Sequence, residues 1–121
     1  MNRIPEAELS RPISEIKAEL FRALANPARI RILELLSERD YAVHELLEQI
    51  EIEASNLSQQ LAVLRRAGLV IQHRESGSVV YSVAVPEVRD LLLAARVILR
   101  ALLAEQDELK AALSPSPRKR R

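Results

Sequence analysis

The chain has 121 residues, of which 48% are hydrophobic and 29% charged, enough for one folded domain with its own core. It contains no cysteine, which excludes disulfides, thiolate metal sites and thiol redox sensing. Four of its 18 basic residues lie in the C-terminal run "RKRR", residues 118–121, so the remainder holds 14 basic and 17 acidic residues, a net charge of −3. Any anion-binding surface outside that run must therefore be a local patch.

The chain shows no sign of a membrane or secretory protein. No apolar run approaches the roughly 18 to 20 residues of a membrane span, and the start "MNRIPEAELS" lacks the apolar segment of a signal peptide. The aromatic residues Phe21, Tyr41 and Tyr81 are too few to stack the bases of single-stranded nucleic acid. We therefore expect a soluble, cytoplasmic protein.

Two helices are predicted after a flexible arm at residues 1–12. In the first, apolar residues recur at three- and four-residue steps, as in an amphipathic helix: Ile13, Ile16, Leu20, Phe21 and Leu24. Asn26 is placed to cap a second helix that starts at Pro27, where the missing N–H has no cost. Its predicted inward residues are Ile30, Ile32, Leu33, Leu35 and Leu36.

Two further helices follow closely. The stretch "YAVHELLEQI", residues 41–50, predicts a short third helix with Val43, Leu46, Leu47 and Ile50 facing inward. Residues 54–67 predict a fourth, with Leu57, Leu61 and Leu64 inward. The end of this fourth helix is marked by Arg65 and Arg66 in its last turn and by Gly68 just beyond.

The period then changes to that of a β-hairpin. Residues 69–74 and 79–85 predict two strands joined through "ESGS", in which Gly77 supplies the turn. Pro86 opens a long last helix, and residues 113–121 are expected to form a disordered basic tail.

The predicted order is α-α-α-α-β-β-α, in a mainly α domain with a small β-hairpin over residues 13–112. The third and fourth helices are separated by only a few residues, as in a helix-turn-helix, and the hairpin that follows makes it a winged helix-turn-helix. This architecture reads double-stranded DNA, because a helix fits the major groove while the hairpin reaches the flanking backbone.

Three stretches of the sequence resemble the ArsR/SmtB family of bacterial winged-helix repressors. They are "ALANPARIRILELL" at 23–36, "SNLSQQLAVLRRAGLV" at 55–70 and "GSVVYSV" at 77–83, similar to the link between the first two helices, the recognition helix and the wing of that family. The resemblance covers roughly residues 13–110. It implies a homodimer built from the first and last helices that binds an imperfect palindrome and releases it when an effector arrives.

The chain departs from the metal sensors of that family. The third helix has no cysteine, and the last helix has acidic residues but no histidine, so neither of the usual metal-sensing motifs is present. We expect no metal and no cofactor, and the effector is unknown. A carboxylate site on the last helix is the remaining possibility for metal sensing: Glu87, Asp90, Glu105, Asp107 and Glu108.

The outward face of the fourth helix is the predicted base-reading surface. Ser55, Asn56, Ser58 and Gln59 remain outside once the three leucines face inward, and such side chains hydrogen-bond to base edges. The resemblance aligns Ser55, Ser58 and Gln59 with base-facing positions, whereas Gln60 lies nearer the core and is interpreted as structural. As an isolated helix, the same face could simply be solvated.

Basic and hydroxyl residues around this helix are predicted to contact the DNA backbone: Arg65, Arg66, Arg74, Ser76 and Ser78. Arg65 and Arg66 could equally be charges that stabilise the C-terminus of the helix. The basic tail could add nonspecific DNA affinity or only solubility.

The last helix is apolar over more of its surface than one small core needs, which predicts dimerisation. The predicted interface comprises Ile16, Leu20, Leu24, Leu91, Leu92, Ala95, Ile98, Leu99, Leu102 and Leu103.

Catalysis is not expected, because the chain has two histidines, no Gly-rich phosphate loop and no paired carboxylates in a recognisable context. The sequence thus predicts a homodimeric transcriptional regulator, a repressor that binds a palindromic operator through helix 54–67 and wing 69–85. The alternatives are a winged-helix module that binds a protein, and the atypical metal sensor.

Overall fold

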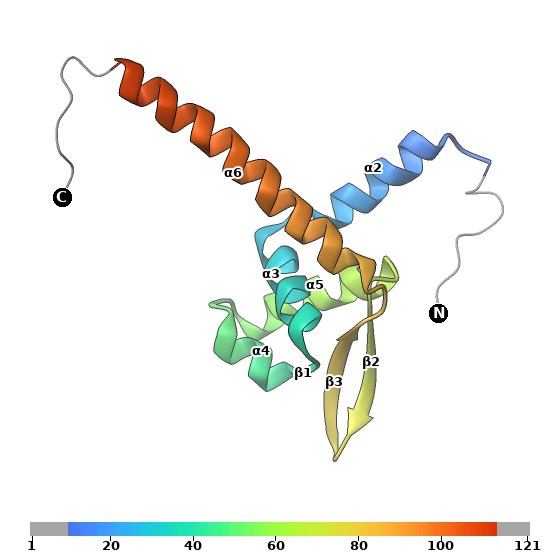
Figure 1. The fold of residues 1–121 in the computed structure, drawn as a ribbon. Helices are drawn as coiled ribbons and strands as arrows, with labels where there is room; N and C mark the ends of the chain where they lie inside the picture. The colour runs from blue at the N-terminus through green and yellow to red at the C-terminus, as the bar shows by residue number, and fades with distance from the viewer. Residues whose placement is uncertain (1–9, 114–121) are drawn as a thin grey trace. The chain divides into compact units, whose positions relative to one another are not determined.

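The computed structural model describes residues 10–113, which form two compact units, one up to Arg89 and one from Asp90 on (Figure 1). The expected arm and tail lie outside the described residues except for residues 10–12 and 113. Of these, Arg11 is bound to Glu19 by two hydrogen bonds, from Nη1 to Oε1 at 2.8 Å and from Nη2 to Oε2 at 2.6 Å. That ion pair lowers the pKa of the Glu19 carboxyl.

The first two predicted helices are present as α2 (Ile13–Leu24) and α3 (Pro27–Glu38). The Asn26 Oδ1 accepts a hydrogen bond from the backbone N–H of Arg29 at 3.1 Å, and Pro27 is the first helical residue. Both predicted start signals of α3 are therefore confirmed. Four of its five predicted inward residues are buried, and Ile30 is half-buried.

The prediction that the third helix begins at residue 41 was wrong. Tyr41–Ala42 form a short strand, β1, and the helix α4 spans Val43–Gln49. β1 pairs antiparallel with β3 (Ser78–Val83), so the two-stranded hairpin is part of a three-stranded sheet of order β1-β3-β2. Two residues are too few to show the alternating pattern of a strand. They form a strand only by pairing with β3, which lies far along the sequence.

The fourth helix, α5 (Ala54–Arg66), leads into strand β2 (Val70–Glu75). Gly68 adopts φ 78°, and the N–H groups of Gly68 and Leu69 bond to the carbonyls of Arg65 and Leu64 at 2.9 and 3.0 Å. This pair of bonds is a Schellman motif, which satisfies the last carbonyls of α5 and turns the chain into the sheet. The predicted strands are each displaced by one or two residues but are otherwise confirmed.

The core of the first unit lies between α3, α4, α5 and the sheet. Its fully buried side chains come from these helices: Ile32, Leu33, Leu46, Leu57, Leu61 and Leu64. Helix α6 (Glu87–Leu113) starts in this unit, where Val88 is its one buried residue, and runs through the second unit. Neither α6 nor any other helix between residues 10 and 113 is long and apolar enough to cross a membrane.

Candidate nucleic-acid interface

The rotation of α5 about its axis is fixed by three leucines. Leu57, Leu61 and Leu64 are at most 2% exposed and anchor one side of the helix in the core. Since neighbouring positions on a helix diverge, the residues between them point outward. The predicted base-reading residues, Ser55, Asn56, Ser58 and Gln59, are all exposed.

Gln60 is half-buried, and its amide joins two other side chains. Its Oε1 accepts a hydrogen bond from Arg29 Nη1 at 2.7 Å, and its Nε2 donates to Asn56 Oδ1 at 2.9 Å. The structural role expected of Gln60 is therefore present. Among the four predicted base readers, Asn56 is the one whose side chain is hydrogen-bonded to another side chain within residues 10–113.

Sequence reasoning missed Arg29. Its Nε donates to the carbonyl of Ala23 at 2.6 Å and its Nη2 to that of Arg22 at 3.1 Å, so its guanidinium caps the C-terminus of α2. An available signal was its position: a basic residue in the first turn of a helix opposes the helix dipole. Such a residue has to find its acceptors elsewhere, here the electron-rich end of the preceding helix.

The wing is a hairpin closed by the facing pair Glu75 and Ser78. The two residues between them, Ser76 and Gly77, have φ of 52° and 81°, the combination that a type I′ turn requires. This turn places the exposed Ser76 and Ser78 at the tip. Sequence reasoning anticipated the glycine but not the positive φ of Ser76.

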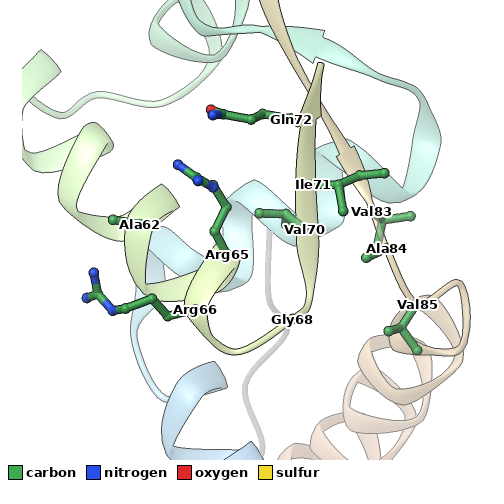
Figure 2. Close-up of a pocket in the computed structure, with 10 residues that line it drawn as sticks. All are labelled: Ala62, Arg65, Arg66, Gly68, Val70, Ile71, Gln72, Val83, Ala84 and Val85. Atoms are coloured by element: carbon green, nitrogen blue, oxygen red, sulfur yellow. The ribbon is translucent and has the colours of Figure 1, made fainter. Parts of the chain in front are cut away.

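Arg74 lies one position from the tip, opposite Val79, and is exposed. In a strand, alternate residues share a face, so Arg74 and Gln72 share the face of Val70, which is buried. His73 lies on the other face, where its Nε2 is 3.3 Å from Glu75 Oε2. Arg74 thus lies on the same face of β2 as Gln72, whose side chain lies between α5 and β2 (Figure 2), and within residues 10–113 no hydrogen bond or ion pair engages the Arg74 side chain.

A shallow groove separates the end of α5 from the sheet (Figure 2). Figure 2 shows the side chains of Arg65, Val70 and Gln72 on the side between α5 and β2, whereas Ile71 points the other way. The lining residues are apolar apart from the two arginines and the glutamine: Ala62, Arg65, Arg66, Gly68, Val70, Ile71, Gln72, Val83, Ala84 and Val85. The groove thus has an apolar floor and a cationic rim.

Arg65 and Arg66 are placed where either of the two predicted roles is open to them. They occupy the last turn of α5, where a positive charge stabilises the helix, and both are exposed on the rim of the groove. The two roles are compatible, because a guanidinium near the helix terminus can still reach a phosphate outside.

Glu45 secures the start of α4 next to the sheet. Its Oε1 accepts a hydrogen bond from the backbone N–H of Ala42 at 2.9 Å, and its Oε2 lies 3.3 Å from Arg39 Nη1. The Ala42 bond, with a smaller contribution from Arg39, lowers the pKa of the Glu45 carboxyl. The guanidinium of Arg39 also stacks 3.7 Å from the ring centroid of Tyr41.

The predicted dimer residues differ in how much surface they offer. Leu24 is 6% exposed and belongs to the core, so it offers little surface to a partner. The others are half-buried or exposed: Ile16, Leu20, Leu91, Leu92, Ala95, Ile98, Leu99, Leu102 and Leu103. Across residues 10–113, no three His, Asp or Glu side chains come close enough together to hold a metal ion.

The known proteins to which this chain is similar are bacterial transcriptional regulators. The family model described as bacterial regulatory protein, arsR family, matches residues 26–72. The HTH-type transcriptional regulator Rv0081 of Mycobacterium tuberculosis is 52% identical over 98 residues, which cover 80% of this chain and 86% of Rv0081. The biofilm growth-associated repressor of Agrobacterium fabrum is 36% identical over 84 residues, 69% of this chain and 71% of the repressor.

Solved structures agree with the sequence matches. The crystal structure of Rv0081 superposes with a TM-score of 0.73, covering 79% of this chain and 97% of that one. The homodimeric winged helix-turn-helix DNA-binding domain Mb0332 of Mycobacterium bovis, solved by NMR, has a TM-score of 0.69 at 26% identity, covering 87% and 95% of the two chains. These relatives are described as transcriptional regulators and not as enzymes.

Proposed function

The chain belongs to the arsR family of bacterial regulatory proteins, and from that premise we propose that it is a homodimeric repressor of a palindromic operator. The coarser part of this function follows from the family: the chain is a transcriptional regulator with a winged helix-turn-helix DNA-binding domain. The proposal adds the assembly, the operator and the residues that read it. We expect the protein to act in the cytoplasm, where its operator lies.

The observation that carries the proposal is the division of α5 into two faces. The buried leucines hold the helix against the core, and the uncharged polar residues on the opposite face are exposed. Ser58 and Gln59 lie at the middle of that face and have no charge that would have to be neutralised in the groove. A glutamine amide pairs well with adenine, and a serine hydroxyl with any base, so this face suits the major groove.

The basic residues around α5 match the path of the DNA backbone beside the major groove. Arg66 stands at the end of α5, and Arg74 stands on the face of the wing that turns toward α5. We propose that phosphates pass over the cationic rim of the groove between α5 and β2, with Ser76 and Ser78 at the tip of the wing as further contacts. Phosphate contacts of this kind fix the register of the helix and give no sequence preference of their own.

The apolar stripe of α6 supports a homodimer. Ile98, Leu99, Leu102 and Leu103 are each at least half exposed, which is unusual for four neighbouring large apolar side chains on one helix. A second copy is the partner of choice because the related Mb0332 domain is described as homodimeric. A two-fold dimer presents two copies of α5, so its operator should be a palindrome with half-sites about 34 Å apart.

Repression is the simplest action of such a dimer, because a protein bound over a promoter blocks the polymerase. The Agrobacterium relative is described as a repressor, in keeping with this assignment. A promoter fusion in cells with and without the gene for this chain tests the direction of regulation. Higher expression without the gene is expected, and lower expression would make the protein an activator.

DNA binding itself is tested with the full-length protein and the DNA upstream of its own gene. We expect a footprint with two-fold symmetry, and an affinity that falls steeply as salt rises because condensed counterions are released from the phosphates. A winged-helix module that binds a protein instead would give neither the footprint nor the salt dependence.

A further inference from the structure

Three side chains form a hydrogen-bonded chain that ends on the outward face of α5. Arg29 Nη1 donates to Gln60 Oε1 at 2.7 Å, and Gln60 Nε2 donates to Asn56 Oδ1 at 2.9 Å. A guanidinium has only donors, so Gln60 has to turn its oxygen toward Arg29 and its NH2 group away. Arg29 thereby sets the direction of both hydrogen bonds in this Arg29–Gln60–Asn56 network.

The same hydrogen-bonded network also orients the amide of Asn56. Its Oδ1 is the acceptor for Gln60, and across residues 10–113 no hydrogen bond engages its Nδ2. Asn56 is exposed on the same face as Ser55 and Gln59. Asn56 thus has both protons of its NH2 group available for a partner outside the protein, whereas its Oδ1 keeps only one lone pair.

Arg29 is itself held firmly. Its Nε and Nη2 bond to the carbonyls of Ala23 and Arg22 at the end of α2, and its position in the first turn of α3 is fixed by the Asn26 cap. Because the side chain is half-buried and bonded at both ends, water competes less well for it than for an exposed pair. The orientation imposed on Gln60 is thus built into the packing of α2, α3 and α5.

We infer that Arg29 and Gln60 are positioning residues that make Asn56 a hydrogen-bond donor to a base. The edges it suits are those whose accessible atoms are acceptors, namely guanine with O6 and N7 or thymine with O4. A freely rotating asparagine would instead favour adenine, to which it both donates and accepts. This inference rests on the proposed function, because it assumes that α5 enters the major groove.

The test is selection of binding sites from a random-sequence double-stranded DNA library by the full-length protein. The wild-type protein should select guanine or thymine at one position in each half-site, and Asn56→Ala should lose that preference alone. Asn56→Asp places an acceptor outward, so the position should change to cytosine or adenine, whose amino groups are donors. We expect a change of about tenfold in relative affinity between the two kinds of base.

Gln60→Glu is the decisive variant, because residue 60 does not need to touch DNA. A glutamate still accepts from Arg29 but has no proton for Asn56, whose amide should turn over to donate to the new carboxylate. The oxygen of Asn56 then faces outward, and the preference should again move to cytosine or adenine. Gln49→Glu, at an exposed position of α4, is the matched control for the added charge and should leave every base preference unchanged.

The outcomes separate the inference from the proposed function. If the wild-type protein selects no sequence, the proposed function fails. If it selects a site that depends on Gln59 but Gln60→Glu or Asn56→Asp leaves all base preferences as they were, the orientation of Asn56 is wrong and the proposed function stands. Circular dichroism of each variant at the assay temperature shows that the fold is kept.

Discussion

Tyr41 and Tyr81 lie directly opposite each other across β1 and β3, and both side chains are buried. This pair ties the start of the helix-turn-helix to the wing, because Tyr41 lies two residues before the first residue of α4 and Tyr81 belongs to the wing strand β3. For α5 and the wing to act on one DNA site, as we propose, their separation has to be fixed. The tyrosine pair is one of the contacts that fix it.

Tyr41→Ala should therefore lower stability and DNA affinity together. Removing a buried aromatic side chain costs about 3 to 5 kcal/mol of unfolding free energy, and the variant also loses the stacking of Arg39. Tyr41→Phe keeps the ring and should lose under 1.5 kcal/mol, in keeping with a volume-conserving change. Denaturant unfolding followed by circular dichroism measures the unfolding free energy of both variants. Equal losses in the two variants would show that the aromatic ring of Tyr41 does not contribute to stability.

Acid should weaken the cap that Glu45 forms at α4. The pKa of this carboxyl is lowered below its usual value of 4.5, chiefly by the hydrogen bond from the Ala42 N–H. A lowered folded-state pKa means that the stabilisation is fully present above 4.5 and is lost as pH falls through the lowered value. Glu45→Gln should thus be less stable than wild type at pH 7, with the difference shrinking below pH 4.5.

Denaturant midpoints measured from neutral pH down into the acid range check this, at one protein concentration. Glu48→Gln, at an exposed position on the same helix, is the control and should show no such convergence with wild type. A constant difference between Glu45→Gln and wild type at all pH values would contradict the assignment.

Local signals were sufficient for most of this fold. Asn26 and Pro27 predicted the start of α3, and Gly68 predicted the end of α5, because capping depends on a few adjacent residues. The features that were missed depend on contacts between distant positions. Strand β1 exists only through its pairing with β3, and the role of Arg29 depends on Gln60, 31 positions away.

In the candidate site, too, features set by local sequence were predicted, and features set by contacts between distant residues were missed. The periodicity of the leucines placed the four base-reading candidates on the outside of α5, since rotation about a helix is set by its own sequence. It could not show that Asn56 differs from its neighbours, because the hydrogen bond that restrains it comes through Gln60 from another helix. Burial of Leu24 was likewise decided by tertiary packing and not by its place in the repeat.

Gln59→Ala should reduce operator affinity and relax the base preference at one position. Loss of a bidentate contact to a base costs about 1 to 3 kcal/mol per half-site. Gel shifts on the operator and on single-base variants measure both effects. Gln49→Ala, outside the reading face, is the control, and unchanged affinity and preference in Gln59→Ala would remove Gln59 from the base-reading set.

Arg74→Ala should weaken binding to all sequences by a similar factor. Each phosphate contact adds about 0.9 to the slope of log affinity against log salt, so a dimer that loses two contacts should show a slope smaller by about 2. Arg31→Ala is the matched control, because Arg31 is an exposed arginine of α3 paired with Glu34 at 3.5 Å. Titrations at four or more salt concentrations give the slopes, and an unchanged slope in Arg74→Ala would mean that the wing arginine does not reach the backbone.

The dimer interface can be tested within α6 because its apolar residues do not all lie on one side. Leu91, Ala95, Ile98 and Leu102 follow one another at steps of four, three and four residues, and Leu99 lies beside this stripe. Val97, which is 62% exposed against 56% for Leu99, falls on the other side of the helix with Arg100 and Ala104.

Leu99→Glu should therefore convert the dimer to a monomer at micromolar concentration, since a buried unpaired carboxylate is costly, whereas Val97→Glu should leave it intact. Light scattering coupled to size-exclusion chromatography measures the mass of each. The Leu99→Glu monomer should also lose operator affinity by orders of magnitude, because it holds only one half-site. Equal masses for both variants would mean that the stripe on α6 is not the dimer interface.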